Sequence, residues 1–510
     1  MTQSVKKRYA AKLAANLVGL IIGLFTVSII PRGLGPKYYG EFSFLTDFFG
    51  QLISLFTLAT SIGFYVKLSQ RQNEFGLISF YYQFTGLAIL VMFLFVGGSQ
   101  ITGASKTFWI DQSIIYVYMA AFYAALIWLV GLMTNVVDAY GLTISTEIAK
   151  IVQKFLGTLI LLSLFLVKQL TLANFFLYNY IISVLLIVAF LWIITRNGIP
   201  FFQNWKLNKE EIKQYIQEFY KYSHPLFVYA IIGVFTGVFD RWLLQKYAGS
   251  AQQGYFGLSL QISGICFIFT SAMATLITRE FAITYKNNDI NEMARLFRRY
   301  IPMLYAVAAY FGCFVSVQAS KIIFIFAGKQ YANAVIPMAI MALYPIHQTY
   351  GQLSGSVFYA TGKTKVFRNI GLFFMILGLP ILYIALAPSG KMGFNAGATG
   401  LAIKFVLIQF IAVNVQLFYS SRMLKLRFIK YFSHQVICMS TLLGLALISK
   451  LIIDKLLLVD ANIIISFLIS GFIYSILVLL LIFFFPAAFG VYKSDVKSAL
   501  KILSSAIGFK

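Results

Sequence analysis

Long apolar runs recur along the whole chain and are separated by short polar or basic breaks. A helix that crosses the hydrocarbon core of a bilayer needs about 20 mostly apolar residues. By that measure the pattern predicts about fourteen transmembrane helices. The expected spans are 11–31, 42–64, 76–97, 114–137, 147–167, 171–195, 224–246, 252–277, 300–326, 332–358, 366–388, 396–420, 433–453 and 461–485.

The composition supports the same fold class, an all-α polytopic membrane protein. Hydrophobic residues make up 60% of the chain and charged residues 11%, whereas a soluble domain has about 25% charged residues. The longest breaks, 98–113, 196–223 and 278–299, are too short to hold a folded domain outside the membrane. We therefore expect the function to reside among the transmembrane helices.

The charge distribution predicts an orientation. Most of the 41 basic residues lie in alternate breaks, beginning with the N-terminal segment. Because cytoplasmic loops carry an excess of lysine and arginine, both termini are expected on the cytoplasmic side. The net charge of +25 is then explained by orientation and by contact with anionic lipid headgroups. No nucleic-acid partner is needed.

Motifs for catalysis or metal binding are absent from the sequence. The three cysteines lie in apolar runs without CxxC spacing, and the three histidines form no HExxH or HxH motif. The chain also lacks a P-loop and a glycine-rich nucleotide fingerprint. We therefore expect no metal site and no cofactor, and we do not expect an enzyme.

An internal repeat relates two segments, 33–44 ("GLGPKYYGEFSF") and 247–258 ("YAGSAQQGYFGL"). At one constant separation, Gly35 aligns with Gly249, Gly40 with Gly254 and Phe42 with Phe256. Repeated halves around a central substrate site are common in secondary transporters. The predicted organisation is two six-helix lobes around a central cavity, an N-terminal lobe at 1–200 and a second lobe at 224–432. A cytoplasmic linker at 201–223 joins them, and two additional helices with a cytoplasmic tail follow at 433–510.

Several motifs, in order along the chain, resemble those of the bacterial polysaccharide (O-antigen) flippase family. They are "PRGLGPKYYGEFSF" (31–44), the segment 234–264 with Asp240-Arg241, "IFIFAGKQYANAVIPM" (323–338) and "FYATGKTKVFRN" (358–369). The resemblance implies a multi-pass protein of the bacterial plasma (inner) membrane, in the superfamily that also holds multidrug exporters and the lipid II flippase. It further implies two helical lobes whose central cavity opens alternately to each side.

The resemblance also implies a substrate, an oligosaccharide on undecaprenyl pyrophosphate, and partners in polysaccharide polymerase and chain-length machinery. Two departures from the pattern concern the cavity. Gln261 stands where relatives often carry a basic residue, which makes it an expected polar cavity residue. The segment "LISLFTLAT" (52–60) lacks the paired arginines of the lipid II branch, which argues against lipid II as the substrate.

Charges inside the predicted spans are the candidate site residues, because a charge at mid-bilayer costs about 2.5–3.5 kcal/mol on insertion scales. Arg241 and Lys404 are expected to face the cavity and bind pyrophosphate, although Arg241 could instead reach the headgroups. Arg32 is added because an arginine at the matching place faces the cavity in the lipid II branch. Asp240 is expected to face another helix or the cavity, and it is, with Asp47, a candidate for charge pairing or ion coupling. Asp47 could pair with Arg32 or Arg241, or could bind a coupling ion, H⁺ or Na⁺.

The predicted function is therefore a flippase that moves a lipid-linked oligosaccharide from the cytoplasmic to the outer leaflet by alternating access. A small-molecule multidrug antiporter of the same superfamily is the first alternative, and it would favour an acidic cavity. A polysaccharide polymerase or acyltransferase embedded in the membrane is the second. Such enzymes usually need a large external loop or an intramembrane histidine, and His347 is the only histidine well inside a predicted span.

Overall fold

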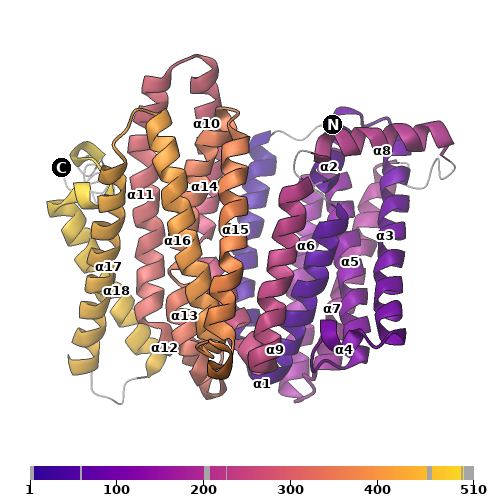
Figure 1. The fold of residues 1–510 in the computed structure, drawn as a ribbon, viewed down its shortest axis with the longest axis horizontal. Coiled ribbons are helices and arrows are strands. Elements are labelled where there is room, and N and C mark those ends of the chain that lie inside the picture. The colour runs from indigo at the N-terminus through magenta and orange to yellow at the C-terminus, as the bar shows by residue number, and fades with distance from the viewer. Residues whose placement is uncertain are drawn as a thin grey trace. The chain divides into compact units, whose positions relative to one another are not determined.

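The computed structural model describes residues 5–57, 60–199, 207–224, 227–456, 462–495 and 498, so the end of the predicted cytoplasmic tail and part of the predicted linker lie outside it. The described residues form helices and no strands, which confirms the all-α prediction (Figure 1). Ten of these helices are long and apolar enough to cross a membrane. In chain order the helices are α1 (Val5–Thr57), α2 (Thr60–Gln70), α3 (Phe75–Ile101), α4 (Ser105–Phe108), α5 (Ile114–Ala139), α6 (Thr143–Leu166), α7 (Leu172–Arg196), α8 (Lys209–Ser223), α9 (Phe227–Ile265), α10 (Ile268–Lys286), α11 (Ile290–Val317), α12 (Ala319–Phe326), η2 (Lys329–Ala334), α13 (Val335–Met341), α14 (Tyr344–Ala360), α15 (Thr364–Leu386), η3 (Ser389–Lys391), α16 (Gly397–Met423), α17 (Phe428–Leu456), α18 (Ile463–Phe484) and η4 (Pro486–Phe489).

Each predicted span overlaps a helix, but two predicted breaks are not loops. The first and second spans form one long helix, α1, and the seventh and the start of the eighth form α9. Only one residue in each leaves the helical conformation, Gly35 (φ 73°, ψ 169°) and Gly249 (φ 79°, ψ −179°). A positive φ at this ψ is open to glycine and costly for other residues. The repeated glycines are therefore the bends that let one helix end and another begin without a loop.

The helices form two compact units, residues 1–254 and 255–510, which are described separately below. In the first unit, α5 packs against α1, α3 and α7. Aromatic side chains fill one of its cores, where Phe48 and Phe49 lie against Trp109 with ring centroids 5.5 and 6.0 Å apart. A second core forms around Phe64, whose ring stacks on Tyr81.

An amphipathic helix, α8, is attached to one end of the first unit. Its N-terminus is closed by a capping box in which Asn208 and Glu211 bond each other's backbone. The apolar face presents Tyr215 and Phe219 to Phe80, at ring distances of 5.2 and 5.8 Å. Burial of this face explains why a helix of mostly polar residues folds here rather than extending into water.

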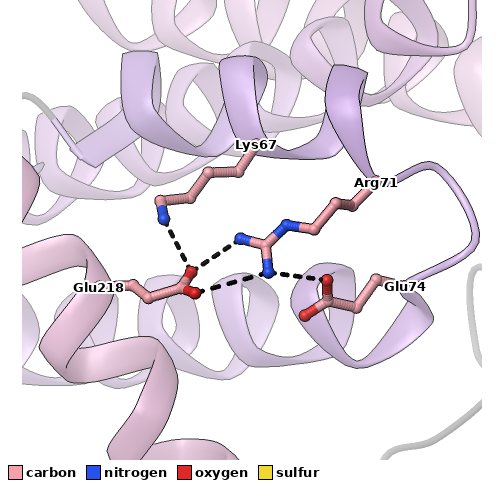
Figure 2. A network of polar contacts seen from close by, with 4 residues as sticks. All are labelled: Lys67, Arg71, Glu74 and Glu218. Carbon is pink, nitrogen blue, oxygen red and sulfur yellow. Dashed lines mark hydrogen bonds and ion pairs between the residues drawn. The ribbon is translucent and has the colours of Figure 1, made fainter.

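Four charged side chains join α8 to the turn between α2 and α3 (Figure 2). Glu218 of α8 accepts hydrogen bonds from Lys67 Nζ at 2.7 Å and from Arg71 Nη2 at 2.8 Å, and Arg71 also pairs with Glu74 at 3.0 Å. The hydrogen bond from Arg71, with that from Lys67, holds the pKa of the Glu218 carboxyl below its usual range, although partial burial opposes the shift. The predicted cytoplasmic linker is thus ordered over α8 and tied to the helices before it.

In the second unit, α14 lies among α10, α11, α15 and α16 (Figure 1). Most of its residues are buried, from Pro345 to Phe358. The last two long helices, α17 and α18, pack along α11 and α12. There Lys321 of α12 bonds Asp454 at 3.4 Å and Ser466 Oγ at 2.9 Å, so one lysine links three helices.

Candidate functional site

The two bends of the first unit bring the repeated segments into direct contact. A Cβ added to Gly40 would lie 1.7 Å from the carbonyl oxygen of Ser250, and one added to Gly254 would lie 2.1 Å from that of Pro36. Such distances leave no room for any side chain at either glycine. The second glycine of each repeat copy is therefore needed so that α1 and α9 can cross backbone to backbone.

Arg241 lies beside this crossing and is 6% exposed. Its Nε is 3.4 Å from Asp47 Oδ2, Nη1 donates to Gln253 Oε1 at 3.0 Å, and Nη2 donates to Ser43 Oγ at 3.3 Å. Of the two partners considered for Asp47, the structure thus brings Arg241 close. A guanidinium is suited to this position because its planar fork of donors can engage three groups at once.

Gln253 fixes the arginine from the other side of the Gly249 bend. It is fully buried, and its Nε2 donates back to the carbonyl oxygen of Arg241 while its Oε1 accepts from the guanidinium. Asp240, next to Arg241 along α9, is also buried at 5% exposure. The neighbouring residues of one helix thus place two buried ionisable groups at the crossing, which is a costly arrangement within a membrane-spanning segment.

The segment after α3 also bonds α9 close to Arg241. Trp242 Nε1 donates to the carbonyl oxygen of Thr107 at 2.7 Å, and Gln245 Nε2 donates to that of Ile110 at 3.1 Å. Gln245 and Gln112 both donate to Ser250 Oγ, at 3.1 and 3.2 Å. These bonds anchor the residues on both sides of Arg241, so its backbone position is well defined.

The geometry allows Arg241 to exchange partners. Its bonds to Asp47 and Ser43, at 3.4 and 3.3 Å, are long for charge-assisted contacts, which are typically about 2.7–2.9 Å. The Asp47 side chain is 34% exposed, whereas that of Arg241 is 8% exposed. An anion that reaches this face could therefore replace Asp47 or Ser43 while Gln253 continues to hold the guanidinium.

Lys404, in α16 of the second unit, is 8% exposed. Its Nζ lies 4.9 Å from the ring centroid of Phe405, and that ring packs against Phe256 and Tyr344. On the neighbouring helix α15, a Cβ added to Gly378 would come within 2.9 Å of Lys404 Cε. Gly378 thus makes room for the lysine stem, and the aromatic face stabilises the ammonium.

Polar side chains link the helices around α14. Gln409 of α16 donates to Gln348 Oε1 at 2.6 Å, and the hydroxyls of Thr270 and Thr349 lie 2.8 Å apart. Gln435 of α17 donates to Asn414 Oδ1 at 2.9 Å. Hydrogen bonds of this kind join helices where water is scarce, and they explain why so many polar residues occur within apolar spans.

The remaining predicted site residues lie at the surface of the described chain. Arg32, just before the Gly35 bend, and Gln261, after the Gly249 bend, are both exposed. The predicted set omitted Ser43 and Gln253, which both bond Arg241. Gln253 immediately precedes Gly254 of the repeat, so the repeat itself was the signal that could have found it. Among the described residues, no cluster of His, Cys, Asp and Glu could hold a metal ion.

Comparison with known proteins gives similarity in structure without similarity in sequence. No family profile matches the sequence, and no curated protein matches it. The structure is similar to that of the lipid II flippase MurJ in an inward closed conformation, with a TM-score of 0.65, 14% identity, and coverage of 93% of this chain and 98% of that chain. It is also similar to an inward-facing multidrug resistance MATE family transporter of the MOP superfamily, with a TM-score of 0.57, 11% identity, and coverage of 81% and 94%. The chain is a multi-pass membrane protein with the fold that these transporters share.

Proposed function

We propose that the protein is a flippase that moves an oligosaccharide on undecaprenyl pyrophosphate from the cytoplasmic to the outer leaflet of the bacterial plasma membrane by alternating access. The observation that carries this proposal is the buried Arg241, held beside the contact of the two repeat copies by partners that an anion could replace. The shared fold with a lipid flippase supports a lipid-linked substrate.

The chemistry of the substrate fits the buried cations. Pyrophosphate is a concentrated anion that loses hydration as it enters a membrane protein, and fixed cations lower that cost. Arg241 and Lys404 are both buried cations, one in each unit. In the proposed cycle each binds the pyrophosphate, Arg32 receives it near the bend, and Gln261 contacts the sugar. Asp47 and Asp240 are the proposed sites for a coupling ion.

Further parts of the proposal follow from the sequence. The lobes at 1–200 and 224–432, with a cavity between them, provide the passage, and both termini lie in the cytoplasm. The product would be passed to polysaccharide polymerase and chain-length machinery. Lipid II is not the proposed substrate, because the second span lacks the paired arginines of the lipid II branch.

Reconstitution of the full chain into liposomes tests the proposal. A fluorescent undecaprenyl-pyrophosphate oligosaccharide is placed in both leaflets, and its accessibility to a membrane-impermeant quencher is followed over time. The chain is expected to accelerate exchange between leaflets, and Arg241→Ala is expected to abolish most of that acceleration. Equal rates with and without the chain would contradict the proposal.

A multidrug antiporter is the second candidate, favoured by the partly exposed carboxylate of Asp47 and by the fold shared with a multidrug resistance transporter. An organic cation would need that carboxylate to be accessible and charged. The same liposomes, loaded with a fluorescent organic cation, distinguish the two. Transport of the cation that is lost in Asp47→Asn, together with no movement of the lipid-linked sugar, would favour the antiporter.

A further inference from the structure

Two adjoining cavities lie between α11, α17 and the η4 turn of the second unit. The larger, of 560 Å³, is lined by charged, polar and apolar groups, among them Arg298, Lys430 and His434. The smaller, of 280 Å³, runs between α11, α17 and α18, and its lining is almost wholly apolar. Both are lined by Val491, so the basic cavity and the apolar cavity lie next to each other.

The chain builds this site through a tight turn after α18. The turn Pro486–Phe489 ends at Gly490, which has a φ of +67°. A Cβ at Gly490 would lie 2.5 Å from Pro302 Cβ and 2.7 Å from the backbone nitrogen of Met303. Only glycine lets the turn fold back onto α11 at this distance. Close packing of the turn against α11 therefore fixes this wall of the larger cavity.

The basic end of the site holds two cations whose charge is not balanced locally. Among the described residues, neither Arg298 nor Lys430 has an acidic partner within 4.0 Å, and the residues lining the cavity include no acid. Neighbouring arginines are different, because Arg295 pairs with Glu292 at 2.6 Å and Arg299 with Asp495 at 3.6 Å. The nearby acids are thus committed elsewhere, and the cavity keeps a net positive charge.

His434 adds polar groups beside these cations. Both of its ring nitrogens are buried without a hydrogen-bond partner among the described residues, and its ring lies 6.1 Å from that of Tyr305. Buried polar groups in native proteins are normally hydrogen-bonded. A polar ligand in the cavity, directly or through water, would supply the bond that these nitrogens lack in the described part of the chain.

The smaller cavity complements an acyl chain. Its wall consists of aliphatic and aromatic side chains such as Val307, Leu442 and Leu479. The two hydroxyl groups in its lining, Tyr310 and Ser475, bond each other at 2.6 Å and so offer little to a polar ligand. A ligand that fits both cavities therefore joins an anionic head to an apolar tail.

We propose that this pair of cavities binds an anionic phospholipid, with its phosphodiester between Arg298 and Lys430 and an acyl chain in the apolar cavity. Both cations lie at helix ends that the charge distribution assigns to the cytoplasmic leaflet, where anionic headgroups are available. The lipid bridges α11, α17 and the η4 turn, and it holds the last two long helices against the rest of the second unit. This role is independent of the transported substrate.

Native mass spectrometry of the full chain, released from detergent, tests the proposal with phosphatidylglycerol as the probe and phosphatidylcholine as the zwitterionic comparison. Phosphatidylglycerol is expected to bind more tightly and to raise the thermal midpoint. The double variant Arg298→Gln/Lys430→Gln is expected to weaken its binding by about tenfold or more, because it removes two hydrogen bonds to a charged group. The matched variant Arg295→Gln/Arg427→Gln, with the same change in net charge outside the cavity, should bind as the wild type does.

The other outcomes each overturn the proposal. Equal binding of the two lipids would mean that the charge of the headgroup is not recognised. Equal losses in both double variants would mean that only the overall charge of the chain is sensed. Competition by inorganic phosphate alone would identify a free anion as the occupant, and tighter binding of undecaprenyl phosphate through the same residues would identify the carrier lipid. A separate variant, Val307→Trp, tests the tail: it fills the apolar cavity and is expected to weaken phosphatidylglycerol binding while leaving both cations in place.

Discussion

Arg241 and Lys404 are both buried cations within membrane spans, but the protein builds their surroundings in opposite ways. Arg241 lies at a backbone crossing and is held by Asp47, Ser43 and Gln253. Lys404 lies against an aromatic ring and a glycine of the next helix. The printed contacts of Arg241 are therefore polar bonds to other side chains, whereas those of Lys404 include the face of an aromatic ring and the close approach of a glycine.

The glycines beside the two cations show what this difference means. At the Arg241 crossing, Gly40 approaches the backbone of Ser250, which cannot move without shifting a helix. Beside Lys404, a Cβ at Gly378 would come closest to the flexible end of the lysine side chain. A perturbation near Arg241 is therefore transmitted to the helices, while one near Lys404 is absorbed by rotation of a side chain. We therefore expect binding of an anion at Arg241 to shift the helices. Binding of an anion at Lys404 is expected to leave the helices nearly in place.

The largest effect is expected from Gly40→Ala. Its new methyl group would overlap the Ser250 carbonyl and push α1 from α9, at a cost of about 3 kcal/mol. The variant should show a clear loss of folded protein when heated detergent extracts are examined by fluorescence-detected gel filtration. Gly50→Ala in the same helix meets open space and should be neutral or slightly stabilising. Similar losses in both variants would show that backbone contact at the crossing is unimportant.

Arg241→Ala should rank next, with a fall in lipid-linked sugar exchange of about a hundredfold, since loss of hydrogen bonds from a charged group to the pyrophosphate costs about 1.5–3 kcal/mol. Asp47 and Gln253 then lose their shared cation. Arg241→Lys keeps the charge but cannot engage three groups in one plane, so it should recover only part of the rate. Liposome exchange rates, at matched amounts of folded protein, make the comparison. Full activity in Arg241→Ala would remove the arginine from the proposed mechanism.

A smaller effect is expected at the second cation. Lys404→Met preserves the packing against Gly378 and Phe405 but removes the charge, so the exchange rate should fall about tenfold with normal thermal stability. Gly378→Ala should lower the rate a few-fold by displacing the ammonium. In the double variant, Gly378→Ala should have no further effect, because the group it displaces is gone. Additive losses would show that Gly378 acts through something other than Lys404.

The sequence predicted the helices of this molecule better than it predicted the connections between them. Hydrophobic runs of span length identified each long helix, because burial in lipid depends on local composition. The bends at Gly35 and Gly249 were expected to be loops, since glycines occur at both and nothing in one chain segment reveals that a single non-helical residue suffices. Arg241 and Asp47 stood out as charges in apolar runs. Ser43 and Gln253 did not, because a polar residue at a helix crossing differs from any other only through its distant partner.

The smallest effect is expected at the partly exposed network of Lys67, Arg71 and Glu218, which lies apart from both buried cations. Surface ion pairs contribute about 0.2–1 kcal/mol, so Glu218→Gln should lower the thermal midpoint by about 1–3 °C at pH 7.

Because the pKa of Glu218 is lowered in the folded protein from its ordinary value of 4.5, the stabilisation is present above that value. It is lost as the pH falls through the lowered pKa, so wild type and variant should converge in acid. High salt should also bring the thermal midpoints of the wild type and Glu218→Gln together. The difference in exchange rate between the wild type and Arg241→Ala should depend little on salt, since buried pairs are screened far less. A Glu218→Gln difference that persisted in acid and in high salt would show that packing of α8, and not its charge, holds the linker in place.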